Sequence, residues 1–204
     1  MDFNTKGHEA KEKGNYVSAY IKPGITVAKI TEIVYHQSRG GTEGFKIIHT
    51  GKPMEDLDGK GQIAETTLWA SPKAWEFTKD KFCIMADKLG VRDALDAIQA
   101  SNAEEYAAGL NSVFGPTGPA RWKFIGEEIE GKIDEATGNK KNNWFKASMG
   151  MFGFVEPLSV SEEASELKFD ETDKWDMKRL APSDIESDSP FKEAETTETA
   201  EDWS

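Results

Sequence analysis

The sequence predicts a mainly β domain in residues 1–158, with a helical insert at about residues 71–114 and a disordered acidic tail in residues 159–204. Three observations lead to this prediction. Runs typical of β-strands lie on both sides of one stretch with helical periodicity, turn residues separate these runs, and the charge balance changes sharply near residue 159. A chain of 204 residues has room for one medium domain with such an appendage.

The strand candidates before the insert are rich in β-branched residues, which favour extended backbone. Residues 16–20 form a short run, and residues 25–36 form the longest one. Apolar residues of the long run occupy both alternation faces in different stretches, as in a strand that bends around a small barrel. A turn at residues 38–41 precedes a strand expected at residues 45–49, and a third is expected at residues 62–69.

The insert carries clear helical signals. Ser71 is a suitable N-cap, a proline follows at the first helical position, and Gly90 is a suitable stop. Apolar residues between them recur at steps of three and four, which is one face of an amphipathic helix. A second short helix is expected at residues 91–98, and Ser101 with Glu104 predicts a capping box for a third.

Strands are expected again after the insert, at residues 121–133 and 144–155, joined by a basic turn at residues 137–141. Three strands, a helical insert and two further strands follow the order of a five-stranded OB-like Greek-key barrel, with the insertion between strands 3 and 4. Another small α+β domain is the alternative.

The acidic charge is concentrated at the C-terminal end. Residues 159–204 contain 15 Asp/Glu and 5 Lys/Arg, whereas residues 1–158 contain 22 and 20. A segment this rich in acids, serine and threonine buries too little apolar surface to offset the entropy of ordering it. A solubilising tail is one interpretation. Bulky residues among the acids, including Phe191 and Trp203, favour an interaction tail that binds a partner.

No motif in the sequence indicates catalysis. It contains no phosphate-binding loop, no dinucleotide-binding turn, no zinc-protease helix and no Cys/His cluster with metal-ligand spacing. Residues 56–67 depart from a calcium loop because Lys60 stands where an oxygen ligand is needed and Thr67 where a bidentate Glu is needed. Cys83 lies within an apolar helical pattern, which favours a core position over a nucleophile. We therefore expect a non-enzymatic protein without cofactor or metal.

Membrane association and export are not predicted. The apolar runs are far shorter than the roughly 20 residues that span a bilayer, and the first residues lack the layout of a signal peptide. A single cysteine fits a reducing compartment. The expected location is the cytoplasm.

Aromatic and cationic residues alternate along the predicted strands. Binding to single-stranded nucleic acid needs this pairing, because Lys and Arg neutralise phosphates while flat rings stack on unpaired bases. We expect Tyr35, Phe45 and Trp144 to contact bases, since each adjoins cations and none belongs to the helical core pattern. The candidate DNA-binding residues are Lys22, Tyr35, Arg39, Phe45, Lys46, Trp69, Arg121, Lys123, Lys140, Lys141, Trp144 and Lys146.

Packing in the core is the alternative for each ring. Trp122 and Phe124 lie two residues apart in a predicted strand, so they share one face and one role. The low net charge of residues 1–158 counts against nucleic acid, whose binders usually show a basic footprint. Residues 13–52, however, hold six Lys/Arg against two Asp/Glu, which favours DNA if these cations share a face.

Four features carry a resemblance to a known family: the run at residues 20–25 before a long strand, the helical insert after residues 69–71, the strand at residues 121–124, and the acidic tail with aromatic residues near its end. The sequence thereby resembles the OB-fold single-stranded-DNA-binding proteins of bacteriophage replication modules. The resemblance implies a protein that coats single strands during DNA replication, recombination and repair in the host cytoplasm. It also implies a tail that competes with DNA and binds replication or recombination proteins, here through Phe191 and Trp203. The alternative function is a protein-binding adaptor or a virion-associated structural module.

Overall fold

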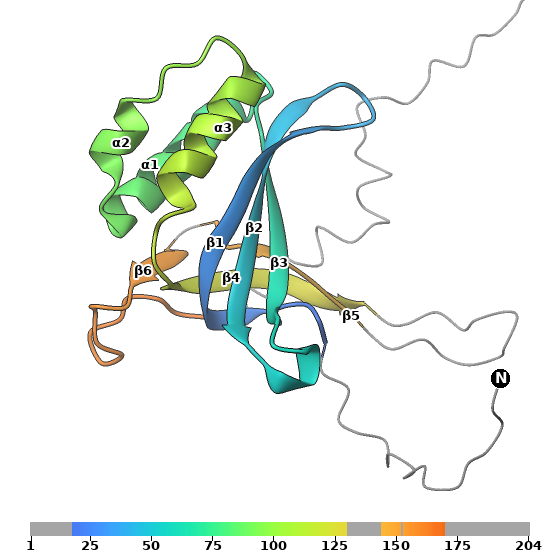
Figure 1. The fold of residues 1–204 in the computed structure, drawn as a ribbon, viewed down its shortest axis with the longest axis vertical. Coiled ribbons are helices and arrows are strands. Elements are labelled where there is room, and N and C mark those ends of the chain that lie inside the picture. The colour runs from blue at the N-terminus through green and yellow to red at the C-terminus, as the bar shows by residue number, and fades with distance from the viewer. Residues whose placement is uncertain (1–17, 130–143, 152, 170–204) are drawn as a thin grey trace, which may run out of the picture.

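Within the residues that the structure describes, which are 18–129, 144–151 and 153–169, an antiparallel six-stranded sheet carries three α-helices inserted after its third strand (Figure 1). The structure is a computed structural model. Its elements are β1 (Gly24–Gln37), β2 (Glu43–Pro53), the short 3-10 helix η1 (Glu55–Leu57), β3 (Gly61–Trp69), α1 (Trp75–Leu89), α2 (Arg92–Asp96), α3 (Ala103–Phe114), β4 (Ala120–Ile129), β5 (Trp144–Met149) and β6 (Val155–Pro157).

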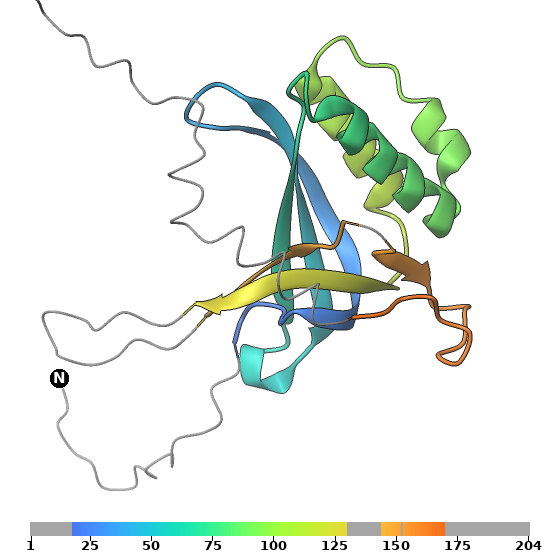
Figure 2. The ribbon, with the colours of Figure 1, turned by 180° about the vertical axis from the view of Figure 1, so that it is seen from behind.

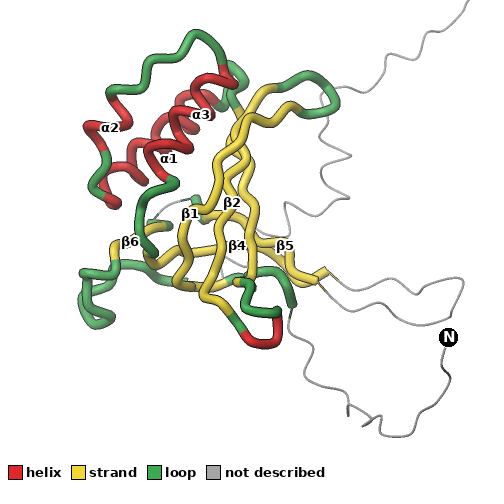
Figure 3. Tube along the Cα trace, viewed as in Figure 1, coloured by secondary structure: helices red, strands yellow, loops and turns green. Residues whose placement is uncertain are grey.

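β1 is shared by two parts of the sheet, and this explains why apolar residues occupy both of its faces. Its first residues pair with β4, and the residues from Ala28 onward pair with β2. Ala28 belongs to both ladders, and its carbonyl accepts a hydrogen bond from Trp122 Nε1 at 2.9 Å. A β-bulge between Ile30 and Glu32 interrupts the ladder with β2. Figure 3 shows β4 and β5 crossing the lower part of the β1–β3 strands.

The predicted closed barrel of five strands is corrected to an open sheet. The strand order is β3-β2-β1-β4-β5 with β6 on β4, and no ladder among the described residues joins β3 to β5. The two end strands nevertheless contact each other. The Met149 amide of β5 donates to the Thr66 hydroxyl of β3 at 2.8 Å. In a closed barrel a backbone carbonyl would accept this hydrogen bond, whereas here a side chain accepts it.

The three helices of the described chain pack against one face of the upper sheet (Figures 1 and 2). The Phe45 ring of β2 meets the rings of Phe82 in α1 and Tyr106 in α3, both at 5.6 Å between centroids. Past the bulge in β1, the Ile33 amide donates to Asn111 Oδ1 of α3 at 2.9 Å. α3 therefore covers the edge of β1 that β4 leaves open, and the insert completes the core.

The helix ends follow the predicted signals with small shifts. The predicted N-cap Ser71 is wrong: α1 begins at Trp75, its N-cap is Ala74 without a side-chain hydrogen bond, and Ser71 begins the turn before it. The predicted stop is confirmed, since the C-cap is Gly90, whose φ of 71° only glycine adopts easily. The capping box lies one residue later than expected. The Asn102 side chain accepts from the Glu105 amide, and the Glu105 carboxylate accepts from the Ser101 amide, both at 2.8 Å. Asparagine is as good an N-cap residue as serine. Asn102 and Glu105 together form both hydrogen bonds, so this pair begins α3.

The C-terminal part of the body departs from the prediction in two ways. The single strand expected at residues 144–155 is split into β5 and β6. The tail predicted from residue 159 begins too early, because residues 159–169 lie against the domain and Leu167 is buried. Residues 170–204 lie outside the described residues.

The core confirms two predictions about single residues. Trp122 and Phe124 point to the same side of β4 and are both buried, as their shared strand face requires. Cys83 is half-buried and packs against the core cluster.

Candidate nucleic-acid interface

The face of β2 and β3 that points away from the helices is the candidate binding surface. In β2, Phe45, Ile47 and His49 are buried, so Lys46 and its alternate neighbours lie on the opposite face. In β3, the same alternation places Glu65 on that face, and Trp69 follows it at the end of the strand. β5 comes much later in the chain than β2 and β3, but it contacts β3 and therefore borders this outer face.

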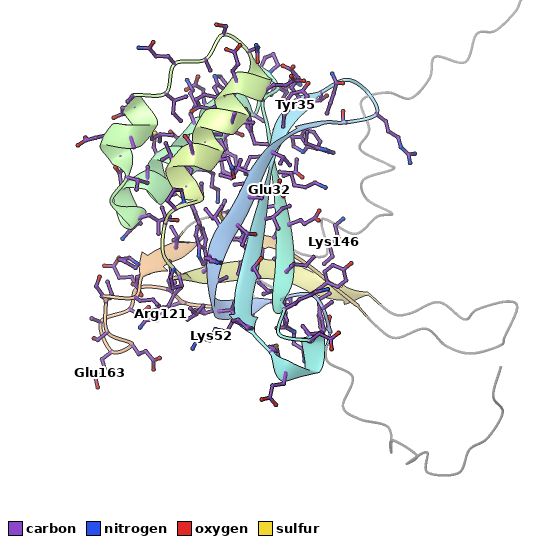
Figure 4. All side chains as sticks on the ribbon, viewed as in Figure 1. Glu32, Tyr35, Lys52, Arg121, Lys146 and Glu163 are labelled. Carbon is purple, nitrogen blue, oxygen red and sulfur yellow. The ribbon has the colours of Figure 1, made fainter. Side chains whose placement is uncertain are left out.

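A hollow of about 370 Å³ lies between β3 and β5 on this face. Its lining combines aromatic residues with lysines: Lys46 and Lys146 are both among the lining residues, and Lys22 Nζ lies 5.2 Å from the centre of the Phe145 ring. Lys146 lies on the side of the sheet away from the helices (Figure 4). The lining residues are Tyr20, His36, Lys46, Ile63, Ala64, Glu65, Thr67, Phe145, Lys146 and Ala147.

A pair of rings borders the hollow at its upper end. The His36 and Trp69 rings lie 5.5 Å apart, and both residues flank Gly44 across the three-stranded part of the sheet. A Cβ atom at position 44 would stand 2.9 Å from a carbon of the Trp69 ring, so a side chain there would push the ring away. Glycine therefore lets the indole lie against the sheet.

A second hollow, of about 520 Å³, begins on the far side of Trp69. It is lined by hydroxyl-bearing residues and by Lys73, close to the turn between β1 and β2 in which Arg39 is exposed. We call the two hollows and the His36–Trp69 pair between them the outer groove. The residues lining the second hollow are Ser38, Thr42, Trp69, Ser71, Pro72, Lys73 and Ala74.

Charges in the outer groove are of both signs. Lys46 Nζ lies 3.0 Å from Glu65 Oε2, with side-chain exposures of 30% and 47%. In the described part of the chain, Lys146 has no ion-pair partner. The groove thus offers Lys46 to an anion only in exchange for Glu65.

The structure brings four of the candidate DNA-binding residues to the outer groove, Lys22, Lys46, Trp69 and Lys146, and places Arg39 in the exposed turn beside it. Arg39 extends the groove at its upper end. These five positions remain candidates.

Four other candidates lie elsewhere. Tyr35 is on the helix side of β1 and donates to Glu43 Oε1 at 3.0 Å. Arg121 bonds to Glu156 Oε2 at 3.2 Å and the Val160 carbonyl at 2.7 Å, on the side of the molecule away from Lys146 (Figure 4). Lys123 lies near Phe154, with its amide bonded to the Phe154 carbonyl. The fourth of these residues is Phe45.

The position of Phe45 does not fit base stacking. The side chain is 1% exposed and its ring packs against three other aromatic rings of the core. A base needs a ring face that solvent can reach. The prediction for Phe45 is therefore corrected to a core role, and Tyr35, which packs beside it against the core, is not part of the groove.

The remaining candidates lie outside what the structure describes. This holds for Lys140 and Lys141, for the tail residues Phe191 and Trp203, and for the side chain of Trp144, which begins β5. Their assignments stay predictions.

The aromatic groove residues that were missing from the sequence-based set are Tyr20, His36 and Phe145. His36 had a usable signal, because pairing the strands across the turn at residues 38–41 places it on the same face as Lys46. Tyr20 had none, since it reaches the groove through an isolated parallel bridge to Ile63, far along the chain.

The sequence matches no protein-family model and no curated protein. In the described ranges, no group of three His, Cys, Asp or Glu side chains is placed to hold a metal ion. None of the helices in that part of the chain has the length and apolar character needed to span a bilayer.

Proposed function

We propose that the protein is a non-enzymatic single-stranded-DNA-binding protein that holds the strand in the outer groove without sequence preference. The observation that carries this proposal is the hollow between β3 and β5, whose lining combines the aromatic residues Tyr20 and Phe145 with Lys46 and Lys146. Rings stack on any base, and cations neutralise any phosphate, so this combination suits single strands of any sequence.

The topology supports the same proposal. If β5 paired with β3, the order β3-β2-β1-β4-β5 would form the ring of an OB barrel, so we describe the fold as an open, OB-like arrangement. OB folds bind oligonucleotides on the face of strands 2 and 3 and on the loops beside it. The outer groove lies on β2 and β3 and next to the β1–β2 turn.

The sequence resemblance to phage single-stranded-DNA-binding proteins supports a role in phage DNA replication and recombination, with partner proteins bound through the acidic C-terminal residues. Charge supports competition between those residues and DNA: residues 170–204 contain 12 Asp/Glu and 4 Lys/Arg. A covalently attached segment reaches an effective concentration in the millimolar range, so weak pairing with groove cations is enough to compete.

The first expected result is tighter binding to an oligo-dT strand than to a matched duplex, with affinity that falls steeply as salt rises. Replacing Lys146 by glutamine should reduce the slope of log affinity against log salt by about 0.7, the share of one neutralised phosphate on a single strand. Fluorescence anisotropy at several salt concentrations measures both quantities.

Lys88→Gln is the matched control, because Lys88 is an exposed lysine in the last turn of α1 and outside the outer groove. It should leave the salt slope at the native value. Equal affinity for single strand and duplex, or equal slopes for the two variants, would contradict binding in the groove.

The second expected result concerns the acidic C-terminal residues. A chain ending at residue 169 keeps the segment that packs on the domain and loses the acidic stretch, so DNA affinity should increase. Ion pairing is screened by salt, so the increase should be largest at low ionic strength. Titrating both chains with oligo-dT across salt concentrations tests this, and affinities that coincide throughout would favour a purely solubilising role.

A protein-binding adaptor or virion-associated module remains the second candidate function. It is favoured by an apolar hollow of about 480 Å³ at the start of α3, lined by Phe45, Trp75 and Tyr106 among others, which DNA binding does not use. A body that binds no single-stranded DNA at low salt would favour this candidate.

A further inference from the structure

An acidic side chain stands in the middle of the surface that we assign to a polyanion. Glu65 lines the hollow between β3 and β5, its side chain is 47% exposed, and its carboxylate lies 3.0 Å from the ammonium of Lys46. A phosphate that approaches Lys46 therefore meets a negative charge already in place.

The strand register fixes this ion pair. In the β2–β3 ladder, Lys46 lies opposite Thr67 and Glu65 lies opposite Ile48, so Lys46 and Glu65 are diagonal neighbours on the outer face. Diagonal partners are within reach of long side chains. The pair thus forms without any ligand, and it occupies Lys46, one of the two lysines among the lining residues of the hollow.

We propose that Glu65 is an internal competitor for the DNA backbone, which sets the affinity of the groove: a phosphate takes the place of the Glu65 carboxylate on Lys46. This inference rests on the proposed function. Exposed ion pairs are weak, so the exchange is possible. The displaced carboxylate stays close to the bound phosphate, and their repulsion weakens the complex.

The exchange also affects the salt dependence of binding. The counterions released on binding are cations condensed on the DNA phosphates. When a phosphate replaces the Glu65 carboxylate on Lys46, the freed carboxylate attracts a cation, which offsets the one that the DNA releases. Without Glu65, Lys46 behaves as an ordinary cation and adds one full phosphate contact to the salt slope. Glu65 therefore makes binding both weaker and less dependent on salt than the groove cations alone would make it.

Glu65→Gln in the full chain tests the proposal, with fluorescence anisotropy on oligo-dT and oligo-dC at several salt concentrations. We expect affinity for both strands to rise about fivefold at low salt, as one unit of nearby like charge is removed. The salt slope should steepen by about 0.7. In the double variant Lys46→Gln/Glu65→Gln, both gains should disappear.

Glu76→Gln is a matched control, because Glu76 is also paired with a lysine, Lys79, at 2.7 Å, but stands on α1 outside the groove. It removes the same charge from the chain and should leave the salt slope unchanged. Thermal melting of each variant shows whether the fold is intact.

The other outcomes are distinct. Equal behaviour of Glu65→Gln and Glu76→Gln in an otherwise DNA-binding protein would overturn the role of Glu65 and leave the proposed function standing. A selective loss of oligo-dC binding would overturn it too, because Glu65 would then accept a hydrogen bond from the cytosine amino group. Absence of binding by the native chain and every variant would contradict the proposed function itself.

Discussion

Replacing His49 by leucine is expected to keep the protein folded at acidic pH values where the native chain unfolds. His49 points into the core from β2, is 0% exposed, and contacts the rings of Trp122 and Phe124 at 4.4 and 5.2 Å between centroids. In the described structure, neither ring nitrogen has a hydrogen-bond partner. A proton on this ring would place an unpaired charge in an apolar site.

Burial accordingly lowers the pKa of His49 from 6.5 to about 3. Below pH 6.5 the unfolded chain binds a proton that the folded chain does not, so the free energy of unfolding falls as the pH falls. The loss is about 1.4 kcal/mol per pH unit, and about 5 kcal/mol by pH 3. A loss of this size is comparable to the whole stability of many domains.

Leucine has a similar volume and no proton to bind, so His49→Leu should abolish this part of the pH dependence. At neutral pH it should also stabilise the fold by about 1–3 kcal/mol, because two unsatisfied nitrogens leave the core. Urea denaturation at pH 7.5 and pH 5 measures both effects. His36→Asn is the control, since His36 is only half-buried on the outer face, and the acid sensitivity due to His49 should persist in it. An unchanged pH dependence in His49→Leu would contradict the argument.

Lys81→Met is expected to destabilise the protein by about 2 kcal/mol, the loss of two buried hydrogen bonds. Lys81 lies on α1, is 3% exposed, and donates to the carbonyls of Gly150 and Met151 after β5. Its ammonium stands over the Phe154 ring, 4.0 Å from the centroid, which adds a cation–π contact. Burial, helped by the charge of Lys123, lowers the pKa of Lys81 to about 7.

Methionine fills the same space but donates no hydrogen bond, so both carbonyls lose their partner. Chemical denaturation at pH 7 gives the change in unfolding free energy. Lys88→Met, an exposed position on the same helix, should change stability by less than about 0.5 kcal/mol. If the two variants were equally stable, the link between α1 and the turn after β5 would be of no energetic importance.

The sequence was informative where local chemistry decides the structure. β-branched residues marked β1 and β3, a glycine with positive φ ended α1, and alternation put Trp122 and Phe124 on one face, where the structure shows both to be buried. Each of these follows from contacts or dihedral preferences within a few residues. The order of strands and insert followed from the same signals.

The faces of β2 were not predictable in this way. Alternation shows that Phe45 and Lys46 point to opposite sides, but not which side the insert covers. That choice rests on contacts with distant residues, such as the Phe45 ring against Tyr106. Arg121 was misplaced for a similar reason: its partner Glu156 comes 35 residues later. Its other acceptor, Val160, lies in a stretch whose composition predicts disorder.

The position of Ala28 in two ladders has a consequence for the order in which the fold assembles. The β1–β2–β3 meander joins residues close in sequence, so closing its loops loses little chain entropy. The β1–β4 ladder joins residues separated by the whole insert, and α3 must also reach the edge of β1. Slow, non-local pairing of this kind limits folding rates. We infer that the local β1–β2–β3 meander forms first and the distant β1–β4 ladder forms later, and that Ala28 takes part in both steps. The hydrogen bond from Trp122 to the Ala28 carbonyl forms last.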